Sequence, residues 1–505
     1  MAEEIEIKLA ATPESLEKIR AMQFDDVGNT GDWQSQSLHN TYFDTAHCHL
    51  RDAEIGVRIR RRNGECVQSV KSAGRIIGGL YQRNESEVEV PGGEPDILAV
   101  EEPYLQIILE EAVEEDGELQ AIFTTGFTRH TRLLGYADGS QIELALDAGK
   151  ISCGDLHTDI CEVELELKAG DSRHLFELGE KLIGELSLVL DSSSKAERGY
   201  ILCKDHDPGE RRFTMVELDP AKSAEEAFEA IGYAGLRHWQ FFEKQLRRRH
   251  TSRSVVQMHR ALLFIQHMYS VFGTLLPRHA GTGLRDSWAR VTHAMSPVYE
   301  KARQTEWLAT LKTRGHELPA DNEFEAQLAQ ELEQEIRRFI GFLDSPGYNK
   351  LMLGLSRWLY RREWRGEIKE QAEGRLQKSI RTFAGKQLDH VMHDLTRTMH
   401  PKNDLLVEEY CEQEAKLARA LDIGLFFGSL FDNKNRQEFR QHWLDLLESI
   451  RDLKRLELFA EARRVAEGRE SIDEDWLLQQ QHKGVARLDE DRREAFQFKP
   501  YWTMS

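Results

Sequence analysis

Hydrophobic and charged residues alternate along the first stretch of the chain, from Glu4 to Lys8. Successive side chains of an extended strand point to opposite faces, so Glu4, Glu6 and Lys8 share one face and aliphatic residues share the other. Like charges on one face repel unless a cation or a charged ligand lies between them. The pattern therefore favours a binding face, and it is also compatible with an edge strand whose charged side is wet.

Later segments have the same two-faced pattern. The segment 56–60 alternates aliphatic residues with Arg58 and Arg60, and the Asn-Gly pair at 63–64 is typical of a hairpin turn. Few neutral polar residues dilute the charged faces, as they would in a common sandwich. We therefore expect strands closed into a barrel, with helices on the aliphatic faces and a charged lumen. Acid-bearing strands of this kind are predicted at 85–90, 142–147 and 161–168.

From about Ser223 onward the pattern changes to the 3.6-residue period of helices. Ser223, followed three residues later by Glu226, has the sequence of a capping box. Long amphipathic runs follow, which predict paired helical bundles. The predicted division is a β-rich domain at 1–204, a linker at 205–222, a helical domain at 223–467 and a loosely ordered tail at 468–505.

The composition narrows the class of function. The 505 residues carry a formal net charge of −20, whereas general binders of nucleic acid or anionic membranes need a basic surface. The six cysteines form no closely spaced pair, which is typical of reduced thiols in a cytosolic protein. No signal peptide is visible, and the longest apolar stretch, at 423–431, is too short to span a bilayer. We expect a cytoplasmic protein without a nucleic-acid or membrane partner.

Eight motifs follow one another in the first 200 residues. They are EIEIK at 4–8, YFDT at 42–45, GVRIR at 56–60, VKSAG at 70–74, GGLYQRNE at 78–85, ELALD at 143–147, CEVELEL at 161–167 and SSKAERGY at 193–200. In order and spacing they resemble the CYTH superfamily of triphosphate tunnel enzymes. The resemblance extends to bacterial inorganic triphosphatases in which a CYTH domain precedes a CHAD domain. It implies an α+β chain, with an N-terminal antiparallel β-barrel tunnel followed by an all-α helical bundle.

The same resemblance implies two sets of site residues in the tunnel. Cationic side chains would grip phosphates, arginine bidentately and lysine as a point charge. Carboxylates would hold Mg²⁺ or Mn²⁺, which prefer oxygen ligands. Glu4, Glu6 and Lys8 would take part in catalysis. The implied phosphate-binding residues are Lys8, Arg58, Arg60, Lys71, Arg83, Arg129 and Lys195, with Arg198 as a weaker candidate, and the implied metal ligands are Glu4, Glu6, Asp147, Glu162 and Glu164, with Glu166 as a substitute for Glu162.

The segments 255–278 and 345–359 resemble the CHAD domain, a helical module associated with polyphosphate binding. Few cations remain on its first helix, where His259 and Arg260 keep a polar cationic character and neighbouring positions are apolar or neutral. A polyanion gains affinity from accumulated cations. We expect a degenerate module that packs on the tunnel domain or tunes it.

The function that this resemblance implies is metal-assisted hydrolysis of inorganic tripolyphosphate to pyrophosphate and phosphate. Polyphosphate is a further candidate ligand. Alternatives within the family are hydrolysis of an organic triphosphate, such as thiamine triphosphate or a nucleotide, and adenylate cyclisation. The alternative from another class is a non-catalytic polyphosphate-binding protein.

Overall fold

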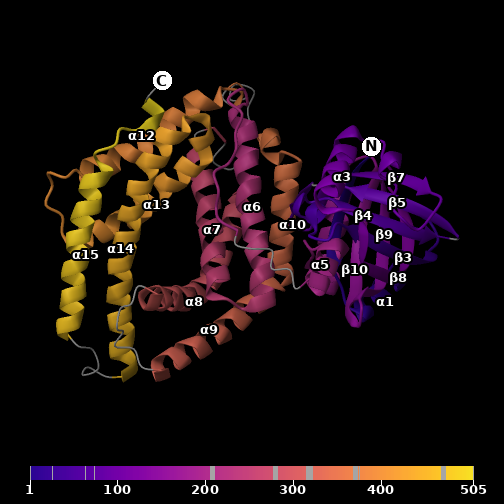
Figure 1. Ribbon diagram of the computed structural model, residues 1–505, viewed down its shortest axis with the longest axis horizontal. Coiled ribbons are helices and arrows are strands. Elements are labelled where there is room, and N and C mark those ends of the chain that lie inside the picture. The colour runs from indigo at the N-terminus through magenta and orange to yellow at the C-terminus, as the bar shows by residue number, and fades with distance from the viewer. Residues whose placement is uncertain are drawn as a thin grey trace. The chain divides into compact units, whose positions relative to one another are not determined.

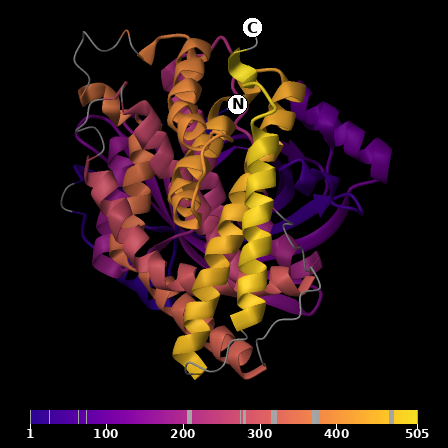
Figure 2. The ribbon, with the colours of Figure 1, turned by 90° about the vertical axis from the view of Figure 1, so that its left-hand side faces the viewer.

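The structure is a computed structural model, and it describes residues 2–24, 27–62, 64–72, 74–204, 211–273, 275–276, 282–313, 322–367, 374, 376–467 and 474–503. The chain divides into two compact units. The first contains Met1–Glu210 and Leu343–Arg361, and the second contains Arg211–Phe342 and Arg362–Ser505. The first unit is rich in strands and the second is helical (Figures 1 and 2).

The first unit is built on an antiparallel sheet that closes through its first strand. Residues 2–7 of β1 pair with β7, and residues 6–10 pair with β10. Each main strand therefore has a neighbour on both sides, which confirms the predicted barrel. In order around the sheet the strands are β1 (Ala2–Ala10), β10 (Leu156–Ala169), β9 (Gln141–Cys153), β8 (Gln120–Gly135), β3 (Gln34–Asp44), β4 (Gly56–Arg62), β5 (Glu65–Lys71) and β7 (Leu80–Val90), with short strands β2 (Asn29–Thr30), β6 (Arg75–Ile77) and β11 (Val189–Leu190) added.

Helices cover the aliphatic faces of these strands, as the alternation predicts. One cluster joins Ile7 and Leu165 of the barrel to α1 (Pro13–Ala21) and α4 (Arg173–Leu186). Another joins Val57 and Ile59 to α2 (His49–Asp52), η1 (Ile97–Ala99) and α3 (Pro103–Asp116). With aliphatic residues packed outward, the charged face of each strand is turned into the lumen.

One part of the lumen is apolar, which the sequence pattern did not predict. Tyr42 lies opposite Arg58 in the strand register, so the two share a face. Tyr42 stacks on Phe123, with ring centroids 4.6 Å apart, and Phe123 meets Tyr200 edge to face. Tyr200 belongs to α5 (Lys195–Lys204), which packs on this aromatic cluster. The lumen is therefore charged, as expected, and also has an aromatic part.

The expectation that all six cysteines are reduced is also wrong. Cys153 at the end of β9 is bonded to Cys203 of α5, across 50 positions of sequence. The four others, Cys48, Cys66, Cys161 and Cys411, are free. Sequence spacing could not reveal this pair, because the fold alone brings α5 to the end of β9.

The second unit contains long helices connected by turns. The predicted capping box is present, since Ser223 and Glu226 cap the first of them reciprocally. A helix also forms at 474–495, so the expectation of a loosely ordered tail is wrong there. The bounds are α6 (Ala224–Arg249), α7 (Ser252–Phe272), α8 (Thr282–Thr313), α9 (Asn322–Leu343), η2 (Glu363–Glu367), α12 (Ile380–Thr398), α13 (Val407–Phe427), η3 (Gly428–Leu430), α14 (Asn433–Glu467), α15 (Glu474–Ala495) and η4 (Tyr501–Thr503).

Two further features bear on the predicted layout. The linker predicted at 205–222 falls outside the described residues at 205–210, and 211–222 contain no helix or strand. The helix α10 (Pro346–Tyr360) lies with the first unit, although its sequence neighbours lie in the second. Over the described part of the chain, every helix is too short or too polar to cross a lipid bilayer.

Candidate active site in the barrel lumen

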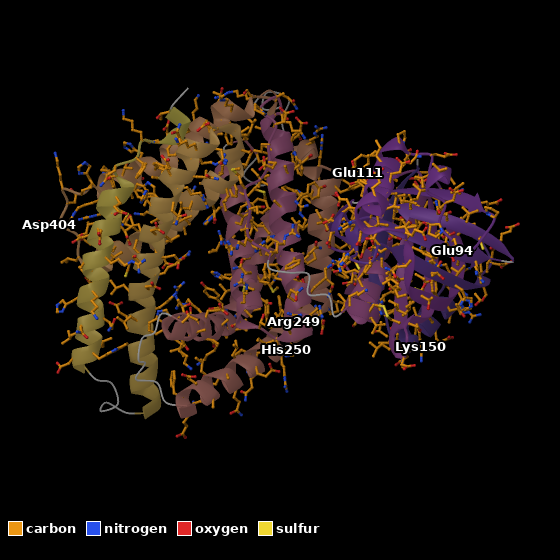
Figure 3. The ribbon with its side chains drawn as sticks, in the orientation of Figure 1. Glu94, Glu111, Lys150, Arg249, His250 and Asp404 are labelled. Carbon is orange, nitrogen blue, oxygen red and sulfur yellow. A yellow bond between two sulfur atoms is a disulfide. The ribbon has the colours of Figure 1, made fainter. Side chains whose placement is uncertain are left out.

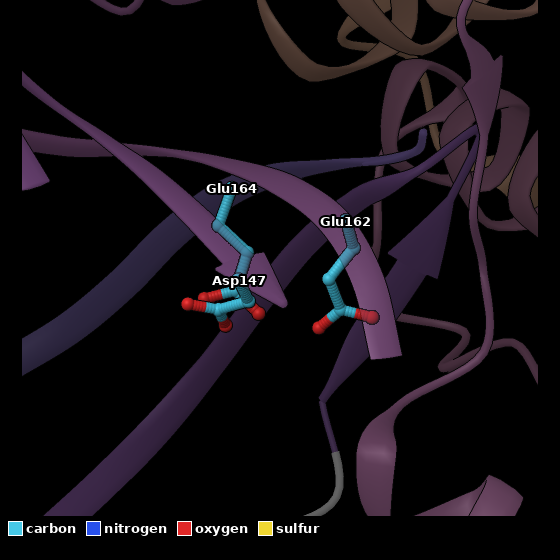
Figure 4. A group of neighbouring side chains, drawn as sticks. All are labelled: Asp147, Glu162 and Glu164. Atoms are coloured by element: carbon cyan, nitrogen blue, oxygen red, sulfur yellow. The ribbon is translucent and has the colours of Figure 1, made fainter. Parts of the chain in front are cut away.

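Three buried carboxylates converge on one wall of the barrel. Asp147 lies on β9 directly opposite Glu162 of β10, and Glu164 follows on the same face of β10. One oxygen from each of the three side chains lies within 4.8 Å of the others (Figure 4). The alternation along β10 turns both glutamates inward, and the β9 register brings Asp147 beside them.

Lysine and arginine side chains surround these acids. Lys195 of α5 places Nζ 2.7 Å from Asp147 Oδ2 and 2.9 Å from Glu164 Oε1, and it also contacts Glu162. Lys8 Nζ lies 3.3 Å from Glu164 Oε1. A buried carboxylate without such partners would be protonated or strongly destabilising, so the cations keep the cluster charged.

Arg129 completes the group with a bidentate pair. Its Nε and Nη2 each donate to one oxygen of Asp147 at 2.7 Å, and Nη2 also contacts Glu164. Burial raises the pKa of Glu164, but Lys195 and Arg129 outweigh burial and hold that pKa well below its ordinary value. The same balance lowers the pKa of Asp147.

This donor set suits a hard divalent cation. Three buried carboxylates with oxygens a few ångströms apart are the ligand type that Mg²⁺ and Mn²⁺ prefer. Asp147, Glu162 and Glu164 therefore fit the predicted metal-binding role. Glu166, the suggested substitute for Glu162, turns to Lys168 at 2.7 Å and stands apart from the trio.

A second group of paired charges lies on β1, β4, β5 and β7. Lys71 Nζ is 2.9 Å from Glu4 Oε2 and 2.9 Å from Glu85 Oε2. Arg58 Nη2 donates to Glu85 Oε1 at 3.0 Å, and the Ser69 hydroxyl donates to the same oxygen at 2.5 Å. Burial raises the pKa of Glu85, but Lys71 and Arg58 outweigh it and lower the pKa to about 2.

The arginines of β4 crowd one another. Arg60 donates to Asn40 Oδ1 at 3.0 Å. The charge of Arg58, together with burial and the charge of Arg129, lowers the pKa of Arg60 to about 10. Because the neighbouring cations affect this pKa more than the neighbouring acids do, positive charge predominates around Arg60, and positive charge attracts anions.

The remaining predicted residues are placed as follows. Glu6 is buried, lies opposite Glu166 in the β1–β10 register, and its charge raises the pKa of Lys8. Arg198 donates to Glu162 Oε2 at 3.3 Å. Arg83 is opposite Glu4 in the register, but its side chain lies outside the described residues.

Sequence reasoning missed several lumen residues. Glu85 was recognised on a charged strand face but was not assigned to the site. Asn40, Tyr42 and Ser69 are neutral, so a search for charged faces passed over them. The signal that could have found Asn40 and Tyr42 is their spacing of two residues on a strand whose neighbour carries Arg60 and Arg58.

In the helical unit, the residues considered for phosphate binding are partly engaged elsewhere. His259 stacks on Tyr299, with ring centroids 3.6 Å apart, and burial lowers its pKa to about 4. The basic run at 247–250 is the end of α6 (Figure 3), where Arg247 pairs with Glu243 at 3.0 Å and His250 with Glu333 at 3.0 Å. Arg247 and His250 are thus engaged with acidic side chains of the helical unit, and His259 is engaged with an aromatic ring.

Comparisons with known proteins agree with this architecture. An inorganic triphosphatase from Haemophilus influenzae is 34% identical over 205 residues, which cover 40% of this chain and 55% of the relative. The chain thus spans about half the length of that curated relative.

Two solved structures are similar to parts of the chain. One is the CHAD domain from the plant Ricinus communis, at 17% identity and a TM-score of 0.45, covering 58% of this chain and 98% of that one. The other is a candidate adenylyl cyclase from Hippeastrum, described as having a dominant triphosphatase activity, at 22% identity and a TM-score of 0.27, covering 39% of this chain and 95% of that one.

Two family models match consecutive parts of the chain. The CYTH domain model matches residues 2–200, which include the barrel strands and the residues of the candidate active site. The CHAD domain model matches residues 230–464, which are helical. The chain therefore contains a CYTH domain followed by a CHAD domain.

Proposed function

We propose that the barrel is the active site of a metal-dependent inorganic triphosphatase, which hydrolyses tripolyphosphate to pyrophosphate and phosphate. The observation that carries the proposal is the arrangement of the lumen. Converging carboxylates on β9 and β10 share one pore with crowded cations such as Arg58 and Arg60. Similarity to a curated inorganic triphosphatase over 205 residues supports the same choice.

The cations account for substrate binding. Tripolyphosphate is a short, highly charged chain, so it needs fixed positive groups spaced along a pore. Arg58 and Arg60 come from β4, Lys71 comes from β5, Arg129 comes from β8 and Lys195 comes from α5, so the cations line the lumen from several elements. When substrate enters, these cations would exchange their present side-chain partners for phosphate oxygens. Arg83 is retained as a further candidate.

The carboxylates account for metal binding, with Asp147, Glu162 and Glu164 as ligands and Glu4 and Glu6 as further candidates. A bound Mg²⁺ or Mn²⁺ would neutralise charge on the phosphate oxygens and on the leaving pyrophosphate. Arg129 and Lys195 orient the three carboxylates through the hydrogen bonds described above. The candidate metal ligands are therefore held in place before substrate arrives.

Lys8 acts as a cation and not as a general base. Burial lowers its pKa, but Glu162, Glu164 and Glu6 outweigh burial and raise the pKa well above its ordinary value. A lysine that stays protonated cannot accept a proton from water at neutral pH. We propose that Lys8 orients the attacked phosphoryl group and stabilises the charge that develops on it.

The alternatives differ in what else the lumen must offer. An organic triphosphate needs a surface for its base or thiazole half, and the lumen aromatics Tyr42 and Phe123 are already stacked on each other. A non-catalytic polyphosphate binder would need cations alone. The buried carboxylates disfavour this alternative, because without a bound metal ion they would repel a polyanion. Cytoplasmic location stays a prediction, against which the Cys153–Cys203 bond weighs.

The deciding experiment is phosphate release from tripolyphosphate, ATP and thiamine triphosphate, measured side by side with Mg²⁺ and with Mn²⁺. We expect the highest kcat/KM for tripolyphosphate and none after chelation of the metal. A higher kcat/KM for an organic triphosphate would reassign the substrate. Tight tripolyphosphate binding without turnover would favour the non-catalytic alternative.

A further inference from the structure

The helix α10 belongs to the CHAD match by sequence and to the barrel unit by packing. Its residues, Pro346–Tyr360, fall within the match at 230–464. In the structure, α10 packs on α4 and β11 of the first unit. A helix from the middle of the CHAD match thus completes the packing of the CYTH barrel.

Leu353 makes the apolar part of the contact between α10 and the barrel unit. The side chain is fully buried in the cluster that contains Ile7 of β1 and Leu182 of α4. A β-carbon at Gly179 of α4 would lie 3.0 Å from Leu353 Cδ2 and 3.6 Å from Ile7 Cδ1. The glycine therefore lets α10 approach α4 and the first strand together.

Ser356 joins α10 to the turn between β6 and β7. Its buried hydroxyl lies 2.9 Å from the carbonyl oxygen of Ile77 and 2.9 Å from that of Met352 in its own helix, so the two acceptors share one proton. Gly78 and Gly79 follow with φ of 52° and 73°, which glycine adopts without strain. A β-carbon on Gly78 would lie 2.2 Å from Ser356 Oγ, so the backbone of this turn touches α10.

Asn349 joins α10 to β11. Its side-chain oxygen accepts from the Leu190 amide at 2.9 Å, and its nitrogen donates to the carbonyl oxygens of Leu343 and Ser345 at 3.0 and 2.9 Å. The residue is almost fully buried. With both ends of its amide bonded, Asn349 fixes the position of β11 relative to α10.

The two segments held by α10 bind the backbone of Lys8. The Lys8 amide donates to the Gly79 carbonyl oxygen at 2.9 Å, and the Lys8 carbonyl oxygen accepts from the Asp191 amide at 2.9 Å. Gly79 lies two residues after Ile77, which Ser356 contacts. Asp191 directly follows Leu190, which Asn349 contacts.

We propose that α10 is a positioning element of the candidate active site. Ser356 and Asn349 fix the two segments that hold the amide and the carbonyl of Lys8. They thereby fix where the Lys8 ammonium meets Glu162 and Glu164, at 3.6 and 3.3 Å. The positioning role itself does not depend on the proposed triphosphatase function. Only the kinetic test of it rests on that function.

The test uses three full-length variants and amide hydrogen exchange resolved at single residues. Ser356→Ala loosens the 77–79 turn, and we expect about tenfold faster exchange at the Lys8 amide, the effect of losing one hydrogen bond. Asn349→Leu loosens β11, and we expect a similar change at the Asp191 amide. The control is Arg357→Gln on the same helix, which removes a 2.8 Å contact with Glu180 of α4.

Kinetics with tripolyphosphate give the second readout. We expect about tenfold lower kcat in Ser356→Ala and Asn349→Leu, because a small displacement of a catalytic group slows chemistry, and near-normal kcat in Arg357→Gln. Equal exchange at Lys8 and Asp191 in all three variants would overturn the proposal. If the wild-type protein hydrolyses no triphosphate but the exchange pattern holds, the proposed function fails and the positioning role stands.

Discussion

At the scale of single residues, the structure separates acids that look alike in sequence. Glu162, Glu164 and Glu166 alternate on one strand and share one face, yet Glu166 turns to Lys168. We therefore expect Glu164→Gln to lower kcat by about a hundredfold or more, the usual loss when a group that organises transition-state charge is removed. Glu166→Gln is the matched control, with an expected change under about threefold.

Phosphate release at saturating Mg²⁺ measures both variants, and a Mn²⁺ titration followed by its paramagnetic resonance signal measures metal binding directly. Equal losses in Glu164→Gln and Glu166→Gln would contradict the assignment of Asp147, Glu162 and Glu164 as one site.

The first strand supplies a second prediction at this scale. Glu4 pairs with Lys71. The charge of Glu6 contributes to raising the pKa of both Lys8 and Arg129, after the larger contributions of other acids. Glu4→Ala or Glu6→Ala should nearly abolish turnover of tripolyphosphate, because each removes a candidate metal ligand and a negative charge close to the lumen cations. Near-normal turnover of either variant at saturating Mg²⁺ would remove that residue from the site.

The acid range tests Glu85. Its pKa in the folded protein is about 2, against an ordinary value of 4.5. A depressed carboxyl pKa contributes stability that is present above the unfolded pKa and is lost as the pH falls towards the folded value. Between pH 5 and pH 3 the wild-type barrel should lose about 2 kcal/mol more than Glu85→Gln.

Urea unfolding of the two proteins at both pH values, followed by a signal specific to the barrel unit, measures this difference. The same loss in both proteins would show that Lys71 and Arg58 do not stabilise the Glu85 carboxylate.

At the scale of elements, α5 is tied to the barrel at both ends. Lys195 contacts the acids near its start, the Tyr200 hydroxyl donates to Asp44 at 2.7 Å, and Cys203 near its end is bonded to Cys153. A bond that closes a loop of 50 positions should stabilise the barrel unit by about 4 kcal/mol in the chain-entropy account. Reductant should therefore lower the unfolding midpoint of this unit.

The variant Cys153→Ser should unfold at the reduced midpoint with or without reductant, while Cys411→Ser should behave as the wild type. Counting thiols in the denatured, unreduced protein gives an independent check. Six reactive thiols would mean that the bond is absent from the protein.

At the scale of the whole molecule, the barrel and the helical region cannot be separated at the end of α5. A chain that ends at Lys204 loses Leu353 from the cluster with Ile7 and Leu182, and truncating a buried leucine alone costs about 2–5 kcal/mol. We expect this fragment to melt at a lower temperature and to bind a hydrophobic dye. Supplying residues 343–361 as a fused C-terminal segment should restore much of the melting temperature.

Full stability and full activity of the fragment ending at Lys204 would show that α10 is dispensable. The fused segment is the control, because it restores α10 without the rest of the helical unit. Thermal melting and phosphate release are measured on both shortened proteins.

Much of the fold and the site could be predicted from particular residues. The alternation in β1 and β10 placed Glu4, Glu6 and Lys8 on one charged face and Glu162 and Glu164 on another, because a strand has the same period whatever its partner. The change to helical period after Ser223 located the second domain. The neutral residues Asn40 and Ser69 and the bonded Cys153 and Cys203 could not be predicted, because each depends on a partner distant in sequence.

The sequence by itself determined which side chains face the lumen and which face the helices, because the two-residue period of a strand is local. It did not determine which acid pairs with which cation or which part of the lumen is aromatic. It also did not determine that α10 packs on the barrel rather than with its sequence neighbours. Only the tertiary structure decided these points, because they depend on strand register, barrel closure and helix docking between segments up to 279 positions apart, as in the contact of Ser356 with Ile77.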